Sequence, residues 1–331
     1  MRIVVALGGN ALLRRGEPMT AEAQHTNVRI AAAALADLAR EHQIVVAHGN
    51  GPQVGLMALQ AMNFAPDNPW PLDVLGAETE GMIGYLIEQE LMNALPPGTT
   101  CATLLTRVEV DPSDPAFAEP SKPIGPVYTA TEAKAVQSLH HWSMVTEASG
   151  GLRRVVPSPL PKAILNLPVI EILVEAGVCV ICAGGGGIPV ARGKDGQMEG
   201  VEAVIDKDRT AGLLARQLKA DVLLMLTDVE AVFRDFAGPD QTAIRKITPE
   251  ALDKLSFAAG SMAPKITAAC DFVRAGGGVA GIGKLSDARA ILEGSAGTQI
   301  AAAVTSQKAI APNKRKAPIA AENQSAAVRG L

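Results

Sequence analysis

The chain has few aromatic residues and no long apolar run. Aromatic side chains make up only 3% of its 331 residues, which disfavours binding of single-stranded nucleic acid by base stacking. No apolar stretch reaches the roughly 18 residues that a membrane-spanning helix needs, so we expect no membrane segment. A formal net charge of −4 also lacks the basic excess that is usual in nucleic-acid-binding domains. What remains is an ordinary globular composition, long enough for one large domain or two.

Cysteine is scarce, with four residues at positions 101, 179, 182 and 270. The chain opens directly on a short apolar run rather than on a signal peptide, and we therefore expect a reducing, cytoplasmic setting. Cys179 and Cys182 form a C-x-x-C pattern within a run that is typical of a buried strand. Because residues three apart in a strand point to opposite faces, we interpret both as core residues rather than as metal ligands or a disulfide.

Short apolar runs alternate with segments of helical periodicity, a pattern typical of a mostly parallel sheet in an α/β fold. Most runs lack a clean polar alternation, as expected when helices cover both faces of the sheet. The predicted strands are residues 3–7, 44–47, 101–106, 178–183, 222–227 and 279–282. The predicted helices cover residues 28–38, about 76–93, a segment after Asp208 and a segment that begins near Pro264.

Two segments depart from this rhythm. Residues 109–161 are rich in proline and contain Gly150-Gly151, so we interpret them as an excursion from the core, a small subdomain or a lid. Residues 307–331 carry five basic side chains against one acidic side chain and show no periodicity, which predicts a disordered basic tail. The folded domain is then expected to span residues 1–306.

Glycine clusters follow three of the predicted strands, at Gly8-Gly9-Asn10, at Gly49-Asn50-Gly51 and at residues 184–187. In open α/β sheets, ligands bind beyond the carboxyl ends of the strands, and glycine lets backbone N–H groups approach an anion closely. Tight turns between strand and helix also need glycine. Three clusters at equivalent strand ends nevertheless favour a shared phosphate site.

Lys207 and Lys265 stand at the predicted starts of two helices. A cation near a helix N-terminus meets the positive end of the helix dipole, which costs roughly 0.3–1 kcal/mol. Two such lysines are explained if an anion lies between them, although either could be an ordinary solvated lysine. Asp208, directly after Lys207, could be a structural N-cap or a functional carboxylate.

Phosphoryl transfer would explain this set of residues, because it needs lysines, loop amides and a carboxylate or metal rather than a covalent nucleophile. We find no convincing Ser-His-Asp set and no Gly-x-Ser-x-Gly elbow. Residues 278–284 resemble a Walker A loop, but Leu285 stands where a Ser or Thr would hold magnesium. Residues 276–281 match the dinucleotide fingerprint, yet these glycines precede and interrupt a strand. We interpret both matches as chance, and we expect His48 to orient its neighbouring glycine loop.

Eight stretches, in order from about residue 2 to 305, carry a resemblance to known proteins: VVALGGNALL (4–13), VVAHGNGPQVG (45–55), PLDVLGAETEGMIGY (71–85), SKPIGPVYT (121–129), RRVVPSPLP (153–161), ICAGGGGIPV (181–190), GVEAVIDKDRTAGLLA (200–215) and GSMAPKITAA (260–269). The chain resembles the amino acid kinase family, whose acetylglutamate and uridylate kinases share the GGN and glycine-loop pattern. AHGNGPQVG, KPIGP and VEAVIDKD are specific to its carbamate kinases. The resemblance implies a three-layer αβα sandwich around a mainly parallel sheet, in a homodimer. Its N-terminal part would hold carbamate or carbamoyl phosphate, and its part from about residue 178 would hold the nucleotide. Residues 109–161 would form a lid.

The resemblance also implies the reaction ATP + carbamate = ADP + carbamoyl phosphate with Mg²⁺, often run toward ATP in arginine or ureide breakdown. Lys207 and Lys265 would stabilise the phosphoryl group, Asp208 would orient these lysines, and Lys122 would close over the carbamate. The transferred group would be surrounded by Gly8, Gly9, Asn10, Gly49, Asn50 and Gly51. The nucleotide would lie beside Lys207 and Lys265, near Gly184, Gly185, Thr227, Asp228, Val229, Ala231 and Met262. No protein side chain is assigned as a metal ligand.

Other functions stay open at this point. A kinase of another small carboxylate, such as acetylglutamate, would share the lysines and the loops, and a substrate screen would distinguish it. A non-catalytic sensor of nucleotide or carbamoyl phosphate would bind nucleotide without turnover. A dinucleotide-dependent oxidoreductase would bind NAD.

Overall fold

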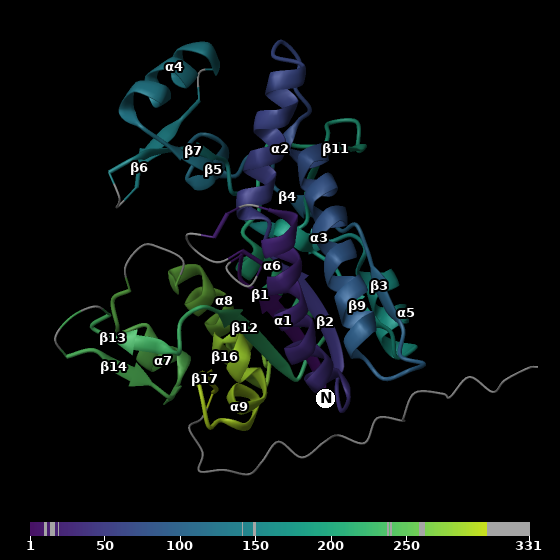
Figure 1. The fold of residues 1–331 in the computed structure, drawn as a ribbon. Helices are drawn as coiled ribbons and strands as arrows, with labels where there is room; N and C mark the ends of the chain where they lie inside the picture. The colour runs from purple at the N-terminus through teal and green to yellow at the C-terminus, as the bar shows by residue number, and fades with distance from the viewer. Residues whose placement is uncertain are drawn as a thin grey trace, which may run out of the picture.

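The computed structural model describes residues 1–302 except 10, 11, 14–16, 19, 141, 148–149, 237, 239 and 258–261 (Figure 1). Asn10 and the predicted basic tail at 307–331 lie outside the described residues. The described residues form a large sheet between two helical layers, with three smaller sheets.

The central sheet contains eight strands in the order β15-β17-β16-β12-β1-β2-β9-β3. All of its neighbouring pairs are parallel except β16 and β17. Because β1 lies between β12 and β2, the carboxyl ends of these three strands meet at one edge of the sheet. The strand bounds are β1 Arg2–Leu7, β2 Gln43–His48, β3 Cys101–Thr103, β9 Cys179–Ile181, β12 Val222–Thr227, β15 Lys246–Ile247, β16 Val279–Lys284 and β17 Thr298–Ile300.

Two hydrophobic cores cover the two faces of this sheet. In β1, Ile3 and Val5 pack into one core and Val4 into the other, and all three side chains are fully buried. Burial on both faces explains why the strand sequences are continuously apolar. The core that contains Ile3 and Val5 also includes side chains of α1 Ala21–Ala39, α3 Leu72–Ala94 and α9 Ala288–Glu293. The core that contains Val4 also includes side chains of α5 Leu167–Glu175, α6 Lys207–Gln217, α7 Pro249–Leu252 and α8 Met262–Arg274. The predicted three-layer αβα fold is confirmed.

A second sheet, in the order β11-β10-β4-β8, and a two-stranded hairpin, β13-β14, were not predicted. These six strands are three to five residues long, too short to show a clear apolar pattern in the sequence. Their bounds are β4 Arg107–Val110, β8 Pro161–Ile164, β10 Ile188–Arg192, β11 Met198–Gly200, β13 Val232–Arg234 and β14 Thr242–Ile244. Among the described residues there are also short 3₁₀ turns at η2 Pro115–Phe117, η3 Gly184–Gly186 and η4 Leu285–Asp287.

The proline-rich excursion contains a separate three-stranded antiparallel sheet, β5-β7-β6, with helix α4 beside it (Figure 1). Its strand β5 lies against α2, so closely that a Cβ on Gly55 would lie 2.0 Å from the Cα of Gly125. A small apolar cluster with Val54 and Ile124 joins the two elements. The bounds are β5 Lys122–Tyr128, α4 Ala130–His140, β6 Met144–Thr146, β7 Leu152–Val156 and α2 Gly51–Phe64. We call residues 122–156 the protruding sheet; the two ends of the 109–161 segment belong to the second sheet instead, through β4 and β8.

The four cysteines are buried free thiols. Cys179 packs into the core on one face of the sheet and Cys182 into the core on the other. The C-x-x-C pattern therefore belongs to the core, as the strand geometry predicted. Residues 279–284 form β16, so the Walker-like and dinucleotide-like matches in this stretch lie on or against a strand.

Candidate active site

Two of the three glycine clusters meet at the carboxyl ends of β1 and β2. The Gly8 N–H donates to the carbonyl of Leu226 at 2.8 Å, and the Gly49 N–H donates to the carbonyl of Leu7 at 3.1 Å. A Cβ on Gly49 would lie 3.2 Å from the Gly9 nitrogen and 3.5 Å from Cε of Lys207. The absence of that Cβ lets the two loops and the lysine side chain approach one another. Apart from the local backbone and the neighbouring residues in the chain, no described heavy atom lies within 4 Å of where a Cβ on Gly9 or on Gly51 would sit.

Lys207 and Lys265, which are 58 positions apart in the sequence, share the carboxylate of Asp208. The Lys207 Nζ lies 2.8 Å from Oδ1 and the Lys265 Nζ lies 3.0 Å from Oδ2. Asp208 is 4% exposed and Lys265 is 6% exposed. Burial alone would raise the pKa of Asp208, but the two ammonium groups outweigh it and hold that pKa below its usual value. The carboxylate therefore stays charged and holds both lysines.

Asp206 is a member of this cluster that the sequence analysis missed. Its Oδ1 accepts from the N–H groups of Asp208 and Arg209, at 2.9 and 3.2 Å, so the N-cap of α6 is Asp206 and not Asp208. Its Oδ2 accepts from the Lys122 ammonium at 2.6 Å, which connects the protruding sheet to α6. Burial would raise the pKa of Asp206, yet Lys122 and Lys207 lower it to about 2. An acidic residue directly before Lys207 was the available signal, because N-caps precede the first helical residue.

The cluster of Lys122, Lys207, Lys265, Asp206 and Asp208 carries three positive charges against two negative charges. It lies at the first turns of α6 and α8, where the helix dipoles add positive potential. Backbone N–H groups of the two glycine loops lie beside it. A net positive, partly buried cluster of this kind favours an anion, and a phosphoryl group has the charge and the oxygens that it would accept.

The third glycine cluster is packed inside the protein. A Cβ on Gly184 would lie 2.4 Å from the His48 ring, and one on Gly186 would lie 2.4 Å from the carbonyl of Ile205. The Gly184 N–H donates to Oε1 of Glu80 at 2.8 Å, so it is already engaged. Gly184 and Gly185 are buried. Glycine is therefore needed at these positions for close packing behind the site, and the loop is not an open phosphate loop.

His48 and Glu80 support this packed loop from within. The His48 Nδ1 lies 3.1 Å from the Gly49 carbonyl and donates to it, and complete burial lowers the pKa of His48 to about 4, so the ring is neutral near pH 7. Burial raises the pKa of Glu80 to about 8, although N–H groups of Thr106 and Gly184 bond its carboxyl group. Neither group reaches the lysine cluster by a hydrogen bond among the described residues.

The residues expected near a nucleotide are spread along the neighbouring strand and helix. Thr227 ends β12, and a Cβ on Gly8 would lie 3.6 Å from its Cα. Met262 begins the helix that carries Lys265. Asp228 is exposed, Val229 is half-buried and Ala231 is fully buried, so Ala231 can offer a ligand little besides its backbone.

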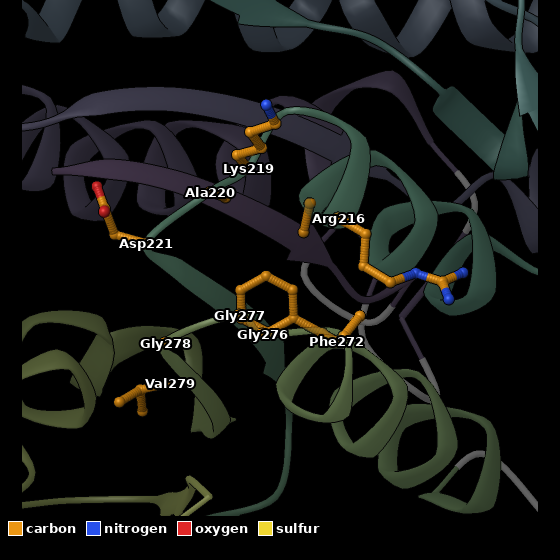
Figure 2. A pocket seen from close by; sticks show the side chains of 11 residues that line it. Arg216, Lys219, Ala220, Asp221, Phe272, Gly276, Gly277, Gly278 and Val279 are labelled. Carbon is orange, nitrogen blue, oxygen red and sulfur yellow. The ribbon is translucent and has the colours of Figure 1, made fainter.

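A hollow of about 430 Å³ lies at the other end of the sheet, before the starts of β12 and β16 (Figure 2). Figure 2 shows the Phe272 ring at its centre, while the charged ends of Arg216, Lys219 and Asp221 point in different directions. The charged groups around this hollow therefore do not converge on one point, whereas those of the lysine cluster contact one another. In the described part of the chain, no group of three or more His, Cys, Asp or Glu side chains is arranged to hold a metal ion. No described helix is long and apolar enough to cross a bilayer.

Comparisons with known proteins show the family of this chain. The model of the amino acid kinase family matches residues 1–282. The chain belongs to the amino acid kinase family, and it is a phosphotransferase.

Its similarity within that family is to the carbamate kinases. Carbamate kinase of Rhizobium meliloti (strain 1021) is 55% identical over 302 residues, which cover 91% of this chain and 93% of that protein. Carbamate kinase of Haemophilus influenzae is 54% identical over 300 residues, covering 91% and 96% of the two chains. The solved structure of carbamate kinase from Giardia lamblia bound to AMP-PNP is 40% identical, with a TM-score of 0.81 over 91% of this chain and 98% of the other.

Proposed function

We propose that this protein transfers a phosphoryl group reversibly between ATP and carbamate, giving ADP and carbamoyl phosphate. The observation that carries the proposal is the cluster in which three lysines share two aspartates at the meeting point of β1, β2 and α6. Phosphoryl transfer spreads negative charge over three oxygens, and fixed ammonium groups stabilise that charge without a covalent intermediate. The carbamate kinases of similar sequence support carbamate as the acceptor.

Each charged residue has a distinct role in this proposal. Lys207 and Lys265 contact the transferred phosphoryl group from the first turns of two helices, and Asp208 holds their ammonium groups in place. Lys122 comes from the protruding sheet and closes over the carbamate or carbamoyl phosphate, so that the protruding sheet acts as a lid. The N–H groups of Gly8 and Gly49 are bonded to the carbonyls of Leu226 and Leu7, so the loop positions that would contact the phosphoryl oxygens among the described residues are Gly9, Asn50 and Gly51.

The nucleotide would lie on the β12 and α8 side of the cluster. We place it near Thr227, Asp228, Val229, Ala231 and Met262, and the Giardia lamblia enzyme bound to AMP-PNP supports nucleotide binding in this fold. We infer that Mg²⁺ enters with the nucleotide, because both cluster carboxylates are occupied by lysines and Mg²⁺ is usually bound through substrate phosphates. The packed residues Gly184 and Gly185 would shape this site from behind rather than touch the nucleotide.

The direct test is ATP synthesis. Purified protein is mixed with carbamoyl phosphate and MgADP, and ATP is measured with a coupled hexokinase assay. We expect turnover in the range usual for kinases, roughly 1–100 per second. A screen with acetylglutamate and ATP in the same preparation distinguishes a kinase of another carboxylate. Nucleotide binding by calorimetry without turnover of any substrate would instead indicate a sensor, and would overturn the proposal.

We also propose that the enzyme works in the cytoplasm in arginine or ureide breakdown. The four cysteines are buried free thiols, which suits a reducing compartment. Carbamoyl phosphate is a mixed anhydride, so its consumption with ADP would yield ATP.

A homodimer is part of the same proposal. The outer face of α3 exposes Met82, Tyr85 and Met92, which are 37%, 60% and 48% exposed, and Leu105 beside Gly81 is 51% exposed. This face adjoins β3, the edge strand of the central sheet. Contiguous exposed apolar side chains next to a sheet edge are typical of a subunit interface.

Tyr85→Glu should convert the dimer to a monomer, because it places a charge in the centre of this apolar face. Sedimentation velocity or light scattering measures the change in mass. Phe236→Glu is the matched control, since Phe236 is 67% exposed but lies beside the β13-β14 hairpin, and this variant should keep the mass of the wild type. A wild-type monomer, or a dimeric Tyr85→Glu variant, would contradict the proposed interface.

A further inference from the structure

Thr79 lies on α3, within the 71–85 stretch, and none of the residues in that stretch has a role in the proposed reaction. Its side chain is completely buried. Its hydroxyl oxygen lies 2.9 Å from Nδ2 of Asn50 and 3.0 Å from each of the carbonyl oxygens of Leu75 and Gly76. Asn50 itself is 6% exposed and is the N-cap of α2, but its side chain makes no capping bond there. The hydrogen bond to Thr79 therefore orients a side chain that the helix end leaves unfixed.

The direction of this hydrogen bond follows from counting protons. A threonine hydroxyl has one hydrogen, and the two helix carbonyls can only accept it. The hydroxyl oxygen must then act as the acceptor toward Asn50, which selects the NH₂ end of the amide over the carbonyl end. With one hydrogen of Nδ2 committed to Thr79, the plane of the amide and the direction of its second N–H are both set.

Gly185 completes the clamp from another side. A Cβ at Gly185 would lie 2.2 Å from Nδ2, 2.4 Å from Cγ and 2.6 Å from Oδ1 of Asn50. The backbone of the packed glycine loop therefore lies directly against the Asn50 amide, and only glycine leaves space for it. Thr79 supplies the polar contact and Gly185 the steric contact, so the amide has little freedom to rotate.

Asn50 stands next to the lysine cluster. Its neighbour Gly49 leaves the space in which Cε of Lys207 lies, at 3.5 Å from where a Cβ would be. The fixed amide therefore belongs to the same loop that packs against the Lys207 side chain, whose ammonium group faces the phosphoryl group in the proposed function. Donors that are fixed before the reaction stabilise developing charge more effectively than donors that must reorient.

We propose that Thr79 is a positioning residue for phosphoryl transfer, acting through the orientation of the Asn50 amide. This inference rests on the proposed function, because its main readout is the rate of that reaction. Thr79 itself touches no reacting atom. It fixes the direction of the second Asn50 N–H, and that direction matters most when charge builds up on the phosphoryl oxygens.

The test compares Thr79→Ser with Thr79→Val. Serine keeps the hydroxyl and its hydrogen bonds, whereas valine has nearly the same shape as threonine and removes them. We expect Thr79→Val to lower kcat by roughly 10-fold or more, since small misplacements of site groups can cost up to about 10²-fold. The KM for MgADP should change by less than about 3-fold, because the nucleotide lies on the other side of the cluster. Thr79→Ser should restore kcat to within about 3-fold of the wild type.

Thr248→Val is the matched stability control. It removes a hydroxyl that caps α7 by accepting from the Ala251 N–H and has no role in the site. Thermal unfolding is measured for all variants, and Thr248→Val should lower Tm without a comparable fall in kcat. A Thr79→Val variant that keeps the wild-type kcat would overturn the inference, as would a Thr79→Ser variant as slow as Thr79→Val. Failure of the wild-type protein to turn over would instead overturn the proposed function.

Discussion

Lys265→Met and Lys207→Met are each expected to lower kcat for ATP synthesis by roughly 10²–10³-fold, with little change in KM for carbamoyl phosphate or MgADP. Removal of one fixed charge donor from a preorganised site commonly has an effect of this size. Methionine keeps most of the side-chain volume, so the buried position of Lys265 is filled without a charge. Steady-state kinetics in the coupled assay measure kcat and both KM values.

The control is Lys246→Met, which removes an exposed lysine from β15 at the far edge of the central sheet. This variant should have the kinetic constants of the wild type. If either Lys207→Met or Lys265→Met keeps the wild-type kcat, that lysine has no place in the mechanism. If a variant raises KM alone, its lysine binds substrate and transition state equally.

Asp208→Asn is expected to combine a large loss of activity with a large loss of stability. The substitution leaves Lys207 and Lys265 facing each other without the carboxylate between them, in a region that is almost completely buried. Removal of one partner from a buried ion pair typically costs about 3–5 kcal/mol in free energy of unfolding. Urea unfolding measures that loss, and kcat should fall by at least 10²-fold because both lysines lose their position.

Asp253→Asn is the matched control, because it removes an aspartate that pairs with Arg274 on the surface. Exposed pairs contribute only about 0–1 kcal/mol, so this variant should unfold near the wild-type urea concentration. A destabilisation of Asp208→Asn as small as that of Asp253→Asn would contradict the buried cluster.

The pH dependence of the free energy of unfolding, compared between the wild type and Asp208→Asn, tests the same cluster a second time. The pKa of Asp208 is lower in the folded state than the ordinary value of 3.8. A carboxylate with a lowered folded-state pKa stabilises the protein fully above its unfolded-state pKa and loses that contribution as the pH falls toward the folded-state value. The stability difference between the wild type and Asp208→Asn should therefore be constant above about pH 5 and shrink below pH 4.

Much of the scaffold could be predicted from sequence patterns because each pattern is local. Residues 222–227 form a strand with the predicted bounds, since a continuous apolar run buried on both faces leaves few alternatives. Helix α2 was missed because it begins inside a glycine cluster, carries a proline in its first turn and contains Gly55, which faces Gly125 of the protruding sheet. The short strands of the second sheet were missed because three to five residues carry too little periodicity.

Part of the candidate site could also be predicted. Lysines at two helix starts indicated an anion site, and the resemblance implied that Asp208 orients them. The N-cap at Asp206 and its contact with Lys122 were not predicted, because residues 84 positions apart come together only when the protruding sheet lies against α2 and α6. The glycine clusters also differ in structure: those after β1 and β2 lie beside the lysine cluster, whereas residues 184–187 are packed inside the protein. The sequence of the clusters does not distinguish these two cases.

The sequence alone determined the αβα scaffold and the chemical type of the site, because strand burial, glycine turns and helix-start lysines are short-range features. Only the tertiary structure decided which groups act together. It placed two aspartates among three lysines from different elements, and it packed Gly184 and Gly185 against the side chains of His48 and Asn50. It also brought Thr79 against Asn50. Charge balance and close packing depend on distances between segments remote in the chain, and those distances exist only once the sheet has formed.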